Sequence, residues 1–353
     1  MSSFKFNNVV IESLVVNLPP IEVTSTELED RLAQTYQRLG IPFGTLEKLS
    51  GVSSRHMWEP QVLPSQAGTQ AVQKLFESSK IQKEEIGSLI SCSVTRDFFE
   101  PAVASLIHDR LSLPEKSLSF DISNACIGFS DGIITTGNMI ESGVLKAGIV
   151  VSAEATTRMI ENSIKHLQTS NDIERDEFLK LLPTLTLGCG SVAFMLCHKD
   201  LAPEGHKIQY IISRTASQFS DLCVGNADYC MSQLEEFNPV MHTESSKLIS
   251  SAAKLGGRCW QDMSEFSDWK KEDVDHVFCH QVGKQVNEAF YREMGLDFSK
   301  EYTIYKKYGN PVSAALPTAL VLGAEEKPIN KGEKVLLTAF GSGLNCRFIA
   351  IEW

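Results

Sequence analysis

The chain has 353 residues, of which 42% are hydrophobic and 22% charged, and its formal net charge is −11. This length provides for two domains around a large buried core, and the acidic balance argues against a nucleic-acid-binding surface. The N-terminus shows no signal-peptide pattern, no apolar run reaches the length of a membrane span, and the nine cysteines have no disulfide-like spacing. These features predict a cytoplasmic protein with reduced thiols, no membrane span and no nucleic-acid partner.

Helix and strand patterns alternate along the first half of the chain. Thr24 and Glu27 form the pattern of a capping box, and a helix is expected from there to Gly40. The elements predicted after it are a helix over 65–79, a strand over 88–94, a helix over 101–112, a strand over 117–122, a helix over 126–142, a strand over 148–152, a charged helical segment over 155–183 and a strand within 186–196. This alternation favours an α/β fold with a mostly parallel sheet.

The second half of the chain repeats the first. Three pairs of features correspond in order: segments 84–94 and 272–282, the strand-to-helix junctions at Cys126 and Asn310, and segments 187–196 and 340–349. The separation of the last pair is shorter, which places an insertion in the first half, most simply the segment 155–183. By default this insertion is a solvated helical lid, but it could also line an acyl channel or the dimer interface. We therefore expect two related halves, residues 1–185 with the insertion and residues 186–353.

Cys126 lies where a short strand pattern gives way to a helix pattern of small residues. Unpaired backbone N–H groups and the positive end of the helix dipole favour a thiolate there, and the same N–H groups can hold an oxyanion. A thiolate is a strong nucleophile, so this position points to acyl transfer through a thioester. The alternative is a buried structural cysteine.

Three further positions carry weaker signals at the ends of predicted strands. His280 ends one strand, Asn310 lies in a Gly-Asn-Pro turn, and the glycine turn 340–343 could aim the Ser342 N–H at a substrate oxygen. Taken singly, each has a structural explanation. His280 could be a hydrogen-bonded polar residue, Asn310 an ordinary turn asparagine, and segment 340–343 a hairpin bend. Because duplicated α/β halves place corresponding strand ends side by side, we expect Cys126, His280 and Asn310 to meet. No metal-ligand spacing is present, so neither a metal nor a cofactor is expected.

The segments Asn-Ala-Cys126, Cys-His280-Gln, Tyr-Gly-Asn310 and Phe-Gly-Ser342-Gly occur in an order and spacing that resemble the thiolase superfamily, most of all its β-ketoacyl synthase III branch. The resemblance covers nearly the whole chain. It implies a five-layered αβαβα fold with two pseudo-symmetric halves, a homodimer and a Cys126–His280–Asn310 centre. It also implies that Cys126 takes an acyl group, that His280 and Asn310 hold the second thioester carbonyl as its enolate forms, and that the N–H groups of Cys126 and Ser342 hold the tetrahedral oxyanion.

The segment Arg96-Asp-Phe-Phe-Glu100-Pro resembles more narrowly the OleA-type enzymes of bacterial long-chain olefin synthesis, which join two fatty acyl-CoA molecules head to head. A malonyl thioester forms its carbanion by losing carbon dioxide, whereas an unactivated acyl-CoA must lose an α-proton to a base. The resemblance implies that Glu100 is this base and reaches across the dimer into the partner's site. From the residues alone, Glu100 also fits an exposed loop carboxylate, and Arg96 and Asp97 could form an ion pair that orients the loop.

The predicted function is a non-decarboxylative Claisen condensation of two fatty acyl-CoA thioesters to a β-keto acid through an acyl-cysteine intermediate. The first alternative is a decarboxylating β-ketoacyl-acyl-carrier-protein synthase III that uses an acyl-CoA primer and a malonyl thioester. Two others are a thioesterase-like activity and a non-catalytic partner of thiolase fold. Fatty acyl-CoA, a second copy of the chain and downstream pathway enzymes are the expected partners.

Overall fold

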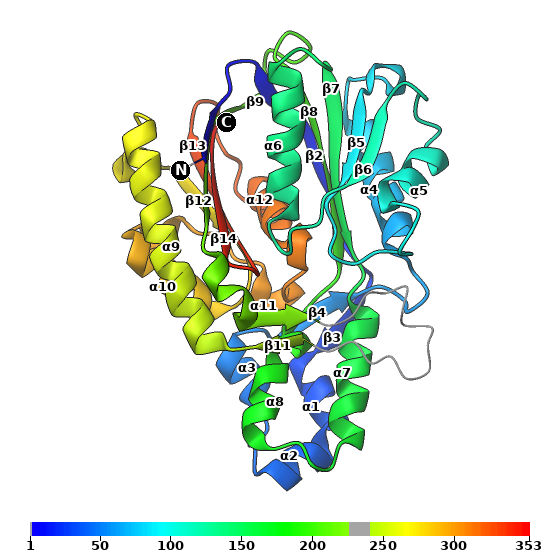
Figure 1. Ribbon diagram of the computed structural model, residues 1–353, viewed down its shortest axis with the longest axis vertical. Helices are drawn as coiled ribbons and strands as arrows, with labels where there is room; N and C mark the ends of the chain where they lie inside the picture. The colour runs from blue at the N-terminus through cyan, green and yellow to red at the C-terminus, as the bar shows by residue number, and fades with distance from the viewer. Residues whose placement is uncertain (1, 226–240) are drawn as a thin grey trace.

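The computed structural model describes residues 2–225 and 241–353. The ten strands of its main sheet are β1 Ser2–Lys5, β2 Val9–Asn17, β5 Ser88–Ser91, β6 Leu118–Asp121, β7 Ala147–Glu154, β8 Gly190–His198, β9 His206–Thr215, β12 His276–Cys279, β13 Lys334–Gly341 and β14 Asn345–Glu352. They follow the order β12-β13-β14-β9-β2-β8-β7-β5-β6, with β1 beside β9. The two halves of this sheet meet at the β2–β9 pairing and lie on either side of central helices (Figure 1).

Helices and strands alternate in five layers. The helices of these layers are α4 Pro64–Ser78 and α5 Val103–Arg110 on one outer face, α6 Gly128–Glu141 and α12 Ala315–Glu326 in the centre, and α9 Ser245–Phe266 and α10 Lys284–Met294 on the other outer face (Figure 1). Apolar side chains of α6 and α12 form one buried cluster with strands of both sheet halves. Separate clusters join α4 and α5 to β5 and β7, and α9 and α10 to β12, β13 and β14. The expected αβαβα arrangement is confirmed.

The sheet is mixed, so the expectation of a mostly parallel sheet is wrong. β5 runs parallel to β6 and β7, and β12 runs parallel to β13. The pairs β7–β8, β2–β8, β9–β14 and β13–β14 are antiparallel. A parallel pair needs a crossover such as the one through α5, which joins β5 to β6, whereas β13 and β14 are joined by a hairpin turn.

The two halves share local details. A short 3-10 turn precedes β5 (Lys83–Glu85) and another precedes β12 (Lys271–Asp273), and in each the last side chain accepts the backbone N–H of the residue before the turn. The counterpart of β6 in the second half is a single parallel bridge between Val277 and Glu301. Because β8 pairs with β2 and β7, we propose that the first half ends after β8 rather than at residue 185.

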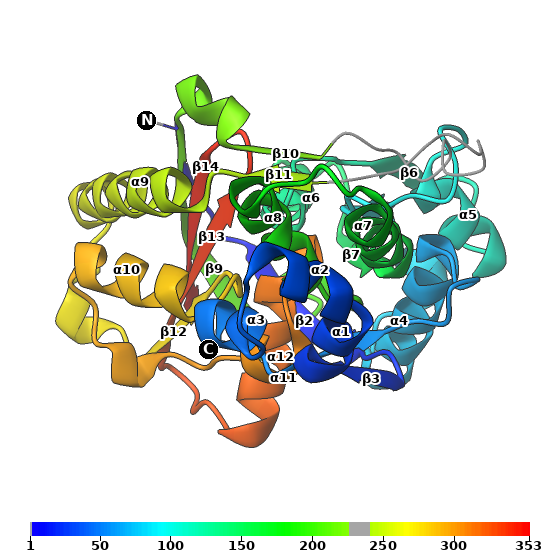
Figure 2. The same cartoon turned by 90° about the horizontal axis from the view of Figure 1, so that it is seen from below.

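Five short helices form a cap over one end of the layers (Figure 2). They are α1 Ser25–Arg31, α2 Ala33–Leu39, α3 Thr45–Ser50, α7 Thr157–Thr169 and α8 Arg175–Leu181, with the hairpin of β3 Ile21–Thr24 and β4 Ser54–Met57 beside them. The capping box is confirmed, since the Glu27 N–H donates to Thr24 Oγ1 at 3.1 Å and the Thr24 N–H to Glu27 Oε2 at 2.6 Å. The single helix expected after it breaks at Leu32 into α1 and α2.

The insertion 155–183 is a packed part of this cap and not a solvated lid. Apolar side chains of α7 and α8 form one buried cluster with those of α1, α2 and α3. Met159 and Pro183 reach from it to the cavity described below. None of the helices within residues 2–225 and 241–353 has the length and hydropathy of a membrane span.

Candidate active site

Cys126 lies in the connection between β6 and α6, two residues before the helix begins at Gly128. The chain turns sharply there, with Ala125 at a φ of 47°. A Cβ on Gly128 would lie 2.6 Å from the Cys92 carbonyl oxygen, and one on Gly132 would lie 2.5 Å from the Cys92 sulfur. Glycine at both positions therefore lets α6 pack directly against the chain that follows β5, which fixes the position of Cys126.

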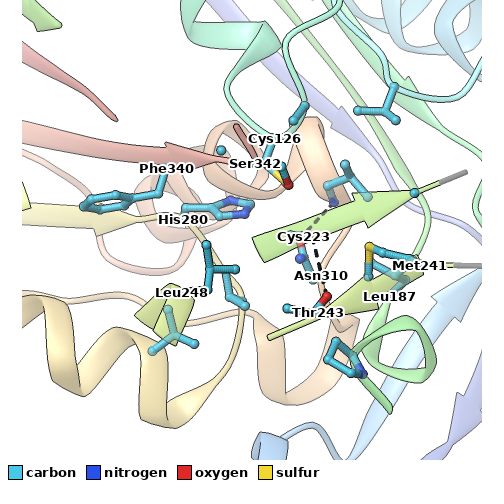
Figure 3. A pocket seen from close by; sticks show the side chains of 18 of the residues that line it. Cys126, Leu187, Cys223, Met241, Thr243, Leu248, His280, Asn310, Phe340 and Ser342 are labelled. Carbon is cyan, nitrogen blue, oxygen red and sulfur yellow. Dashed lines mark hydrogen bonds between the residues drawn. The ribbon is translucent and has the colours of Figure 1, made fainter. Parts of the chain in front are cut away.

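Cys126 lines an apolar cavity of about 280 Å³ together with His280, Asn310 and Ser342. Cys126 lies just before α6 and His280 directly after β12. Asn310 lies in the segment before α12, and Ser342 lies in the turn between β13 and β14. Their side chains lie around one space (Figure 3). The structure therefore brings together four of the five residues that the sequence singled out.

The backbone of this cavity is strained. Within the described ranges, four non-glycine residues have a clearly positive φ, and three of them, Ala125 (47°), Val312 (51°) and Leu344 (47°), line the cavity. Each lies within two residues of one of the predicted site residues. Such conformations cost about 1–3 kcal/mol each and concentrate at functional sites.

His280 is 2% exposed, and its backbone N–H donates to the Thr338 carbonyl at 2.9 Å. Its Nδ1 is buried with no hydrogen-bond partner in the described part of the chain. Burial lowers the pKa of His280 to about 4. The imidazole is therefore neutral at neutral pH, a state in which one ring nitrogen donates a hydrogen bond and the other can take a proton.

Gln281, the next residue, holds the loop that carries His280. Its Nε2 donates to the Cys279 carbonyl at 2.7 Å, and its Oε1 accepts the backbone N–H groups of Ile304 at 2.8 Å and Tyr305 at 3.3 Å. Gln281 is fully buried. Because the side chain of Gln281 must both donate and accept hydrogen bonds, an amide suits this position after His280.

Asn310 is held by its backbone and by its own amide oxygen. Its backbone N–H donates to the Thr186 carbonyl at 2.9 Å, and its own carbonyl accepts the Gly188 N–H at 3.0 Å. Its Oδ1 accepts the Val312 N–H at 3.0 Å. This last bond sets the orientation of the amide, so its Nδ2 group is the part that could donate to a substrate carbonyl in the cavity.

The turn that carries Ser342 is also tied to the region of Cys126. Asn345 donates from Nδ2 to the Ser342 carbonyl at 3.3 Å and to Asn124 Oδ1 at 3.5 Å, while its Oδ1 accepts the Thr215 hydroxyl at 2.8 Å. Asn124 in turn donates to Asp131 at 2.5 Å. Asn345 was not identified from the sequence, where its local signal is its place after a glycine turn.

Burial raises the pKa of the Cys126 thiol, and the neighbouring Cys223 and Glu154 raise it further. The expectation that the helix terminus favours a thiolate is therefore wrong for the resting protein, because desolvation by the apolar lining outweighs the nearby N–H group. The thiol is neutral at rest and must lose its proton as it attacks. The neutral His280 in the same cavity is available to take that proton.

Glu100 does not line the cavity of its own chain. It is exposed, in the loop between β5 and α5, next to Phe98 and Phe99, which are 44% and 71% exposed. Asp97 is buried and accepts the Ser65 N–H at 2.9 Å and the Ser65 hydroxyl. The loop is thus anchored to the start of α4 by Asp97 and Ser65, rather than by the pairing of Asp97 with Arg96 that the sequence suggested.

A fully buried carboxylate, Glu154, lies at the end of β7 and was not identified from the sequence. It accepts the N–H groups of Val94 at 2.9 Å and Thr95 at 3.0 Å, the Thr95 hydroxyl at 2.8 Å, the Ser313 N–H at 3.4 Å and the Ser313 hydroxyl. These bonds join the chain that leads to Glu100 to the chain that follows Asn310. Over residues 2–225 and 241–353, no three histidine, cysteine, aspartate or glutamate side chains converge as metal ligands would.

The fold and the cavity define an acyl-transferring condensing enzyme of thiolase fold. The family model of 3-oxoacyl-[acyl-carrier-protein (ACP)] synthase III matches residues 120–170, and the model of its C-terminal part matches residues 265–353. The acyl-CoA:acyl-CoA alkyltransferase of Xanthomonas campestris is 32% identical over 99% of both chains, and that of Shewanella oneidensis is 32% identical over 99% of this chain and 100% of the relative.

A β-ketoacyl-[acyl-carrier-protein] synthase III of Desulfitobacterium hafniense is 26% identical, covering 86% of this chain and 87% of the relative. The crystal structure of a Cys-to-Ser variant of Xanthomonas campestris OleA with bound lauric acid and lauroyl-CoA superposes with a TM-score of 0.92, covering 99% of this chain and 100% of the other. The chain therefore belongs to the thiolase superfamily, in the OleA-like group of its β-ketoacyl synthase III branch.

Proposed function

We propose that this protein joins two fatty acyl-CoA molecules in a non-decarboxylative Claisen condensation, giving a β-keto acid through an acyl-Cys126 intermediate. The observation that carries this proposal is the apolar cavity that holds Cys126, His280, Asn310 and Ser342 together. The names of the Xanthomonas and Shewanella relatives, and the lauroyl-CoA in the solved relative, support acyl-CoA as the substrate class.

In the first step, the Cys126 sulfur attacks the thioester carbonyl of one acyl-CoA while its proton passes to His280. The N–H groups of Cys126 and Ser342 hold the oxyanion, and CoA leaves with the proton. His280 is neutral in the resting protein, so one of its ring nitrogens can accept this proton. The product is a thioester of Cys126.

In the second step, His280 and Asn310 donate hydrogen bonds to the carbonyl of a second acyl-CoA. This lowers the energy of the enolate that forms when Glu100 of the partner subunit takes the α-proton. The carbanion then attacks the acyl carbonyl and the Cys126 sulfur leaves. Hydrolysis of the remaining thioester frees the β-keto acid. Removing one such oxyanion donor typically costs about 10²–10³ in rate.

The exposed loop and the sheet edge support a homodimer in which Glu100 acts across the interface. Among the residues that the structure describes, β6 ends the sheet and is paired on one side only, with β5. Phe98 and Phe99 are exposed directly before Glu100. A strand edge and adjacent exposed aromatic rings are features of surfaces that pair with another chain.

We infer a cytoplasmic location, because every cysteine in the part of the chain that the structure describes is unpaired. By its resemblance to the OleA type, the protein would act in olefin biosynthesis and pass its β-keto acid to downstream enzymes. Such acids lose carbon dioxide readily, so rapid consumption by a partner fits their chemistry.

The test is to supply lauroyl-CoA alone and then with malonyl-CoA, and to identify the products by mass spectrometry. The proposal expects a product that contains two lauroyl-derived chains without any malonyl donor, and none from Cys126→Ala. Condensation that requires malonyl-CoA would favour the decarboxylating synthase. Free lauric acid with no condensed product would favour the thioesterase-like activity.

A further inference from the structure

We infer that the stacked rings of Phe290 and Phe340 close one arm of the cavity and set the longest acyl chain that this arm accepts, and that Gly256 makes room for the Phe340 ring. The inference rests on the proposed function, which supplies the acyl chain. It names the residues that limit the length of one substrate chain.

Apolar side chains line the cavity on two sides of the line between Cys126 and Asn310. Leu187 and Met241 lie on one side, and Leu248 and Phe340 on the other (Figure 3). The second side forms an arm between α9 and α10. The residues that line this arm are Leu248, Ile249, Ala252, Val286, Phe290 and Phe340.

Two stacked aromatic rings line this arm. Phe290 and Phe340 stack with their ring centroids 3.9 Å apart and their planes at 22°. Both side chains are buried, with 1% of Phe290 and 4% of Phe340 exposed. Phe340 also packs edge-on against Phe348, with the ring centroids 6.2 Å apart. Both rings also belong to a buried core cluster. A chain that grows along this arm therefore meets a wall, because protein cores are close-packed and yield little.

Gly256 explains how the Phe340 ring fits. A Cβ at this position would lie 2.9 Å from Cζ and 3.2 Å from Cε1 of Phe340. Glycine in the middle of the 22-residue α9 is unfavourable for helix stability, so it needs a packing reason. The close approach supplies this reason. Alanine at position 256 would displace the Phe340 ring away from α9, toward Phe290 and the cavity.

The length dependence expected from such a wall is sharp. Each methylene buried in the arm should raise the specificity constant roughly fourfold. Once the chain reaches the rings, a further methylene must displace them, and the specificity constant should fall. The longest chain before this fall is called the cut-off length here.

The test measures the cut-off length with saturated acyl-CoAs that increase in steps of two carbons. Intact-mass detection of the Cys126 adduct measures the cut-off length for the acyl chain that is loaded on Cys126. The yield of condensed product, formed with one acyl chain kept constant, measures the cut-off length for the chain of the second acyl-CoA. The rise in melting temperature caused by free fatty acids of the same lengths measures binding in the absence of any reaction. Circular dichroism and thermal unfolding verify that each variant is folded.

Phe290→Leu should lengthen the cut-off by about two carbons, because leucine has a smaller side chain and leaves space at the wall. Gly256→Ala should shorten it. Phe178→Leu is the matched control, since Phe178 is buried in the apolar cluster of the cap and does not line the cavity. It should lower stability and leave the cut-off unchanged.

A cut-off that stays the same in Phe290→Leu and Gly256→Ala, by all three readouts, would overturn the inference. So would a shift that Phe178→Leu reproduces. If no Cys126 adduct forms but the cut-off lengths for fatty-acid binding shift, the proposed function is overturned and the role of Phe290 and Phe340 in limiting chain length is supported. The two failures are therefore distinguishable.

Discussion

The hydroxyl of Thr95 lies 2.8 Å from a carboxylate oxygen of Glu154, where both side chains are buried next to the cavity. The other carboxylate oxygen accepts the Ser313 hydroxyl. One carboxylate thereby joins the chain that leads to Glu100 to the chain that follows Asn310. Since a buried charged group that loses its partners is costly, Glu154 fixes the relative position of these two segments.

Glu154→Gln should lower the free energy of unfolding by about 2–4 kcal/mol, because the new NH₂ group faces N–H and O–H donors. Condensation should fall more than the loading of Cys126, since the segments that carry Glu100 and Asn310 are displaced. Urea unfolding and intact-mass analysis measure the two effects. The control Glu161→Gln removes an exposed ion pair with Arg31 and should cost less than about 1 kcal/mol. Equal effects of both variants would contradict the role given to Glu154.

Asn310→Asp keeps the oxygen that accepts the Val312 N–H but removes the Nδ2 donor and adds a negative charge. Condensation should fall by about 10²–10³, while a single-turnover assay should still show acylation of Cys126. Asn330→Asp, at an exposed turn, is the matched control. Loss of acylation with preserved folding would place Asn310 in the first step instead.

The reactivity of Cys126 should depend on pH unlike that of a free thiol. Its pKa is raised by burial, so the thiolate fraction should keep increasing above pH 8.5, where ordinary thiols reach half ionisation. Alkylation of the Cys126 peptide by iodoacetamide should therefore rise without a plateau up to pH 10, as followed by mass spectrometry. A plateau at or below pH 8.5 would show that the thiolate is stabilised after all.

The lowered pKa of His280 affects stability at acid pH. Its folded pKa is about 4, below the 6.5 of a free histidine, so the unfolded state takes up the proton first as pH falls. The stability contributed by the neutral ring is present above pH 6.5 and is lost between 6.5 and 4, by up to about 3 kcal/mol. His280→Gln should flatten this part of the stability curve in urea unfolding. His206, whose pKa is also about 4, should account for the slope that remains.

The action of Glu100 in the site of the other subunit can be tested by combining two inactive variants in one dimer. Cys126→Ala lacks the nucleophile and Glu100→Ala lacks the base, but a mixed dimer contains one complete site. Co-expression should restore about one quarter of the wild-type condensation rate, because half of the dimers are mixed and one site in two is complete. No restoration, with mixed dimers verified by native mass spectrometry, would place Glu100 in its own chain's site or outside the mechanism.

Local signals in the sequence predicted the elements that depend on nearby residues. The capping box of Thr24 and Glu27 and the strand-to-helix junction at Cys126 are of this kind. The direction of strand pairing was wrong because it depends on how distant segments meet: β8 and β14 lie antiparallel to their neighbours although they follow the same apolar patterns as parallel strands.

The site was predictable where a residue type marks its own chemistry, as for Cys126 and His280. Glu154 has no such mark, because its partners Thr95 and Ser313 are 59 and 159 residues away and only folding brings them together. Gly256 did leave a signal, as a glycine in the middle of a long helix pattern, but its reason, the Phe340 ring, lies far away in the sequence. The direction of the Cys126 pKa shift likewise depends on the burial that the whole cavity provides.

The most direct test of the condensation uses lauroyl-CoA labelled with ¹³C at its carboxyl carbon as the sole substrate, followed by mass spectrometry of the product. The account predicts a β-keto acid that carries both labels, one of which leaves as carbon dioxide on heating to yield a ketone with a single label. A product that forms only when a malonyl thioester is added, or labelled lauric acid as the sole product, would contradict it.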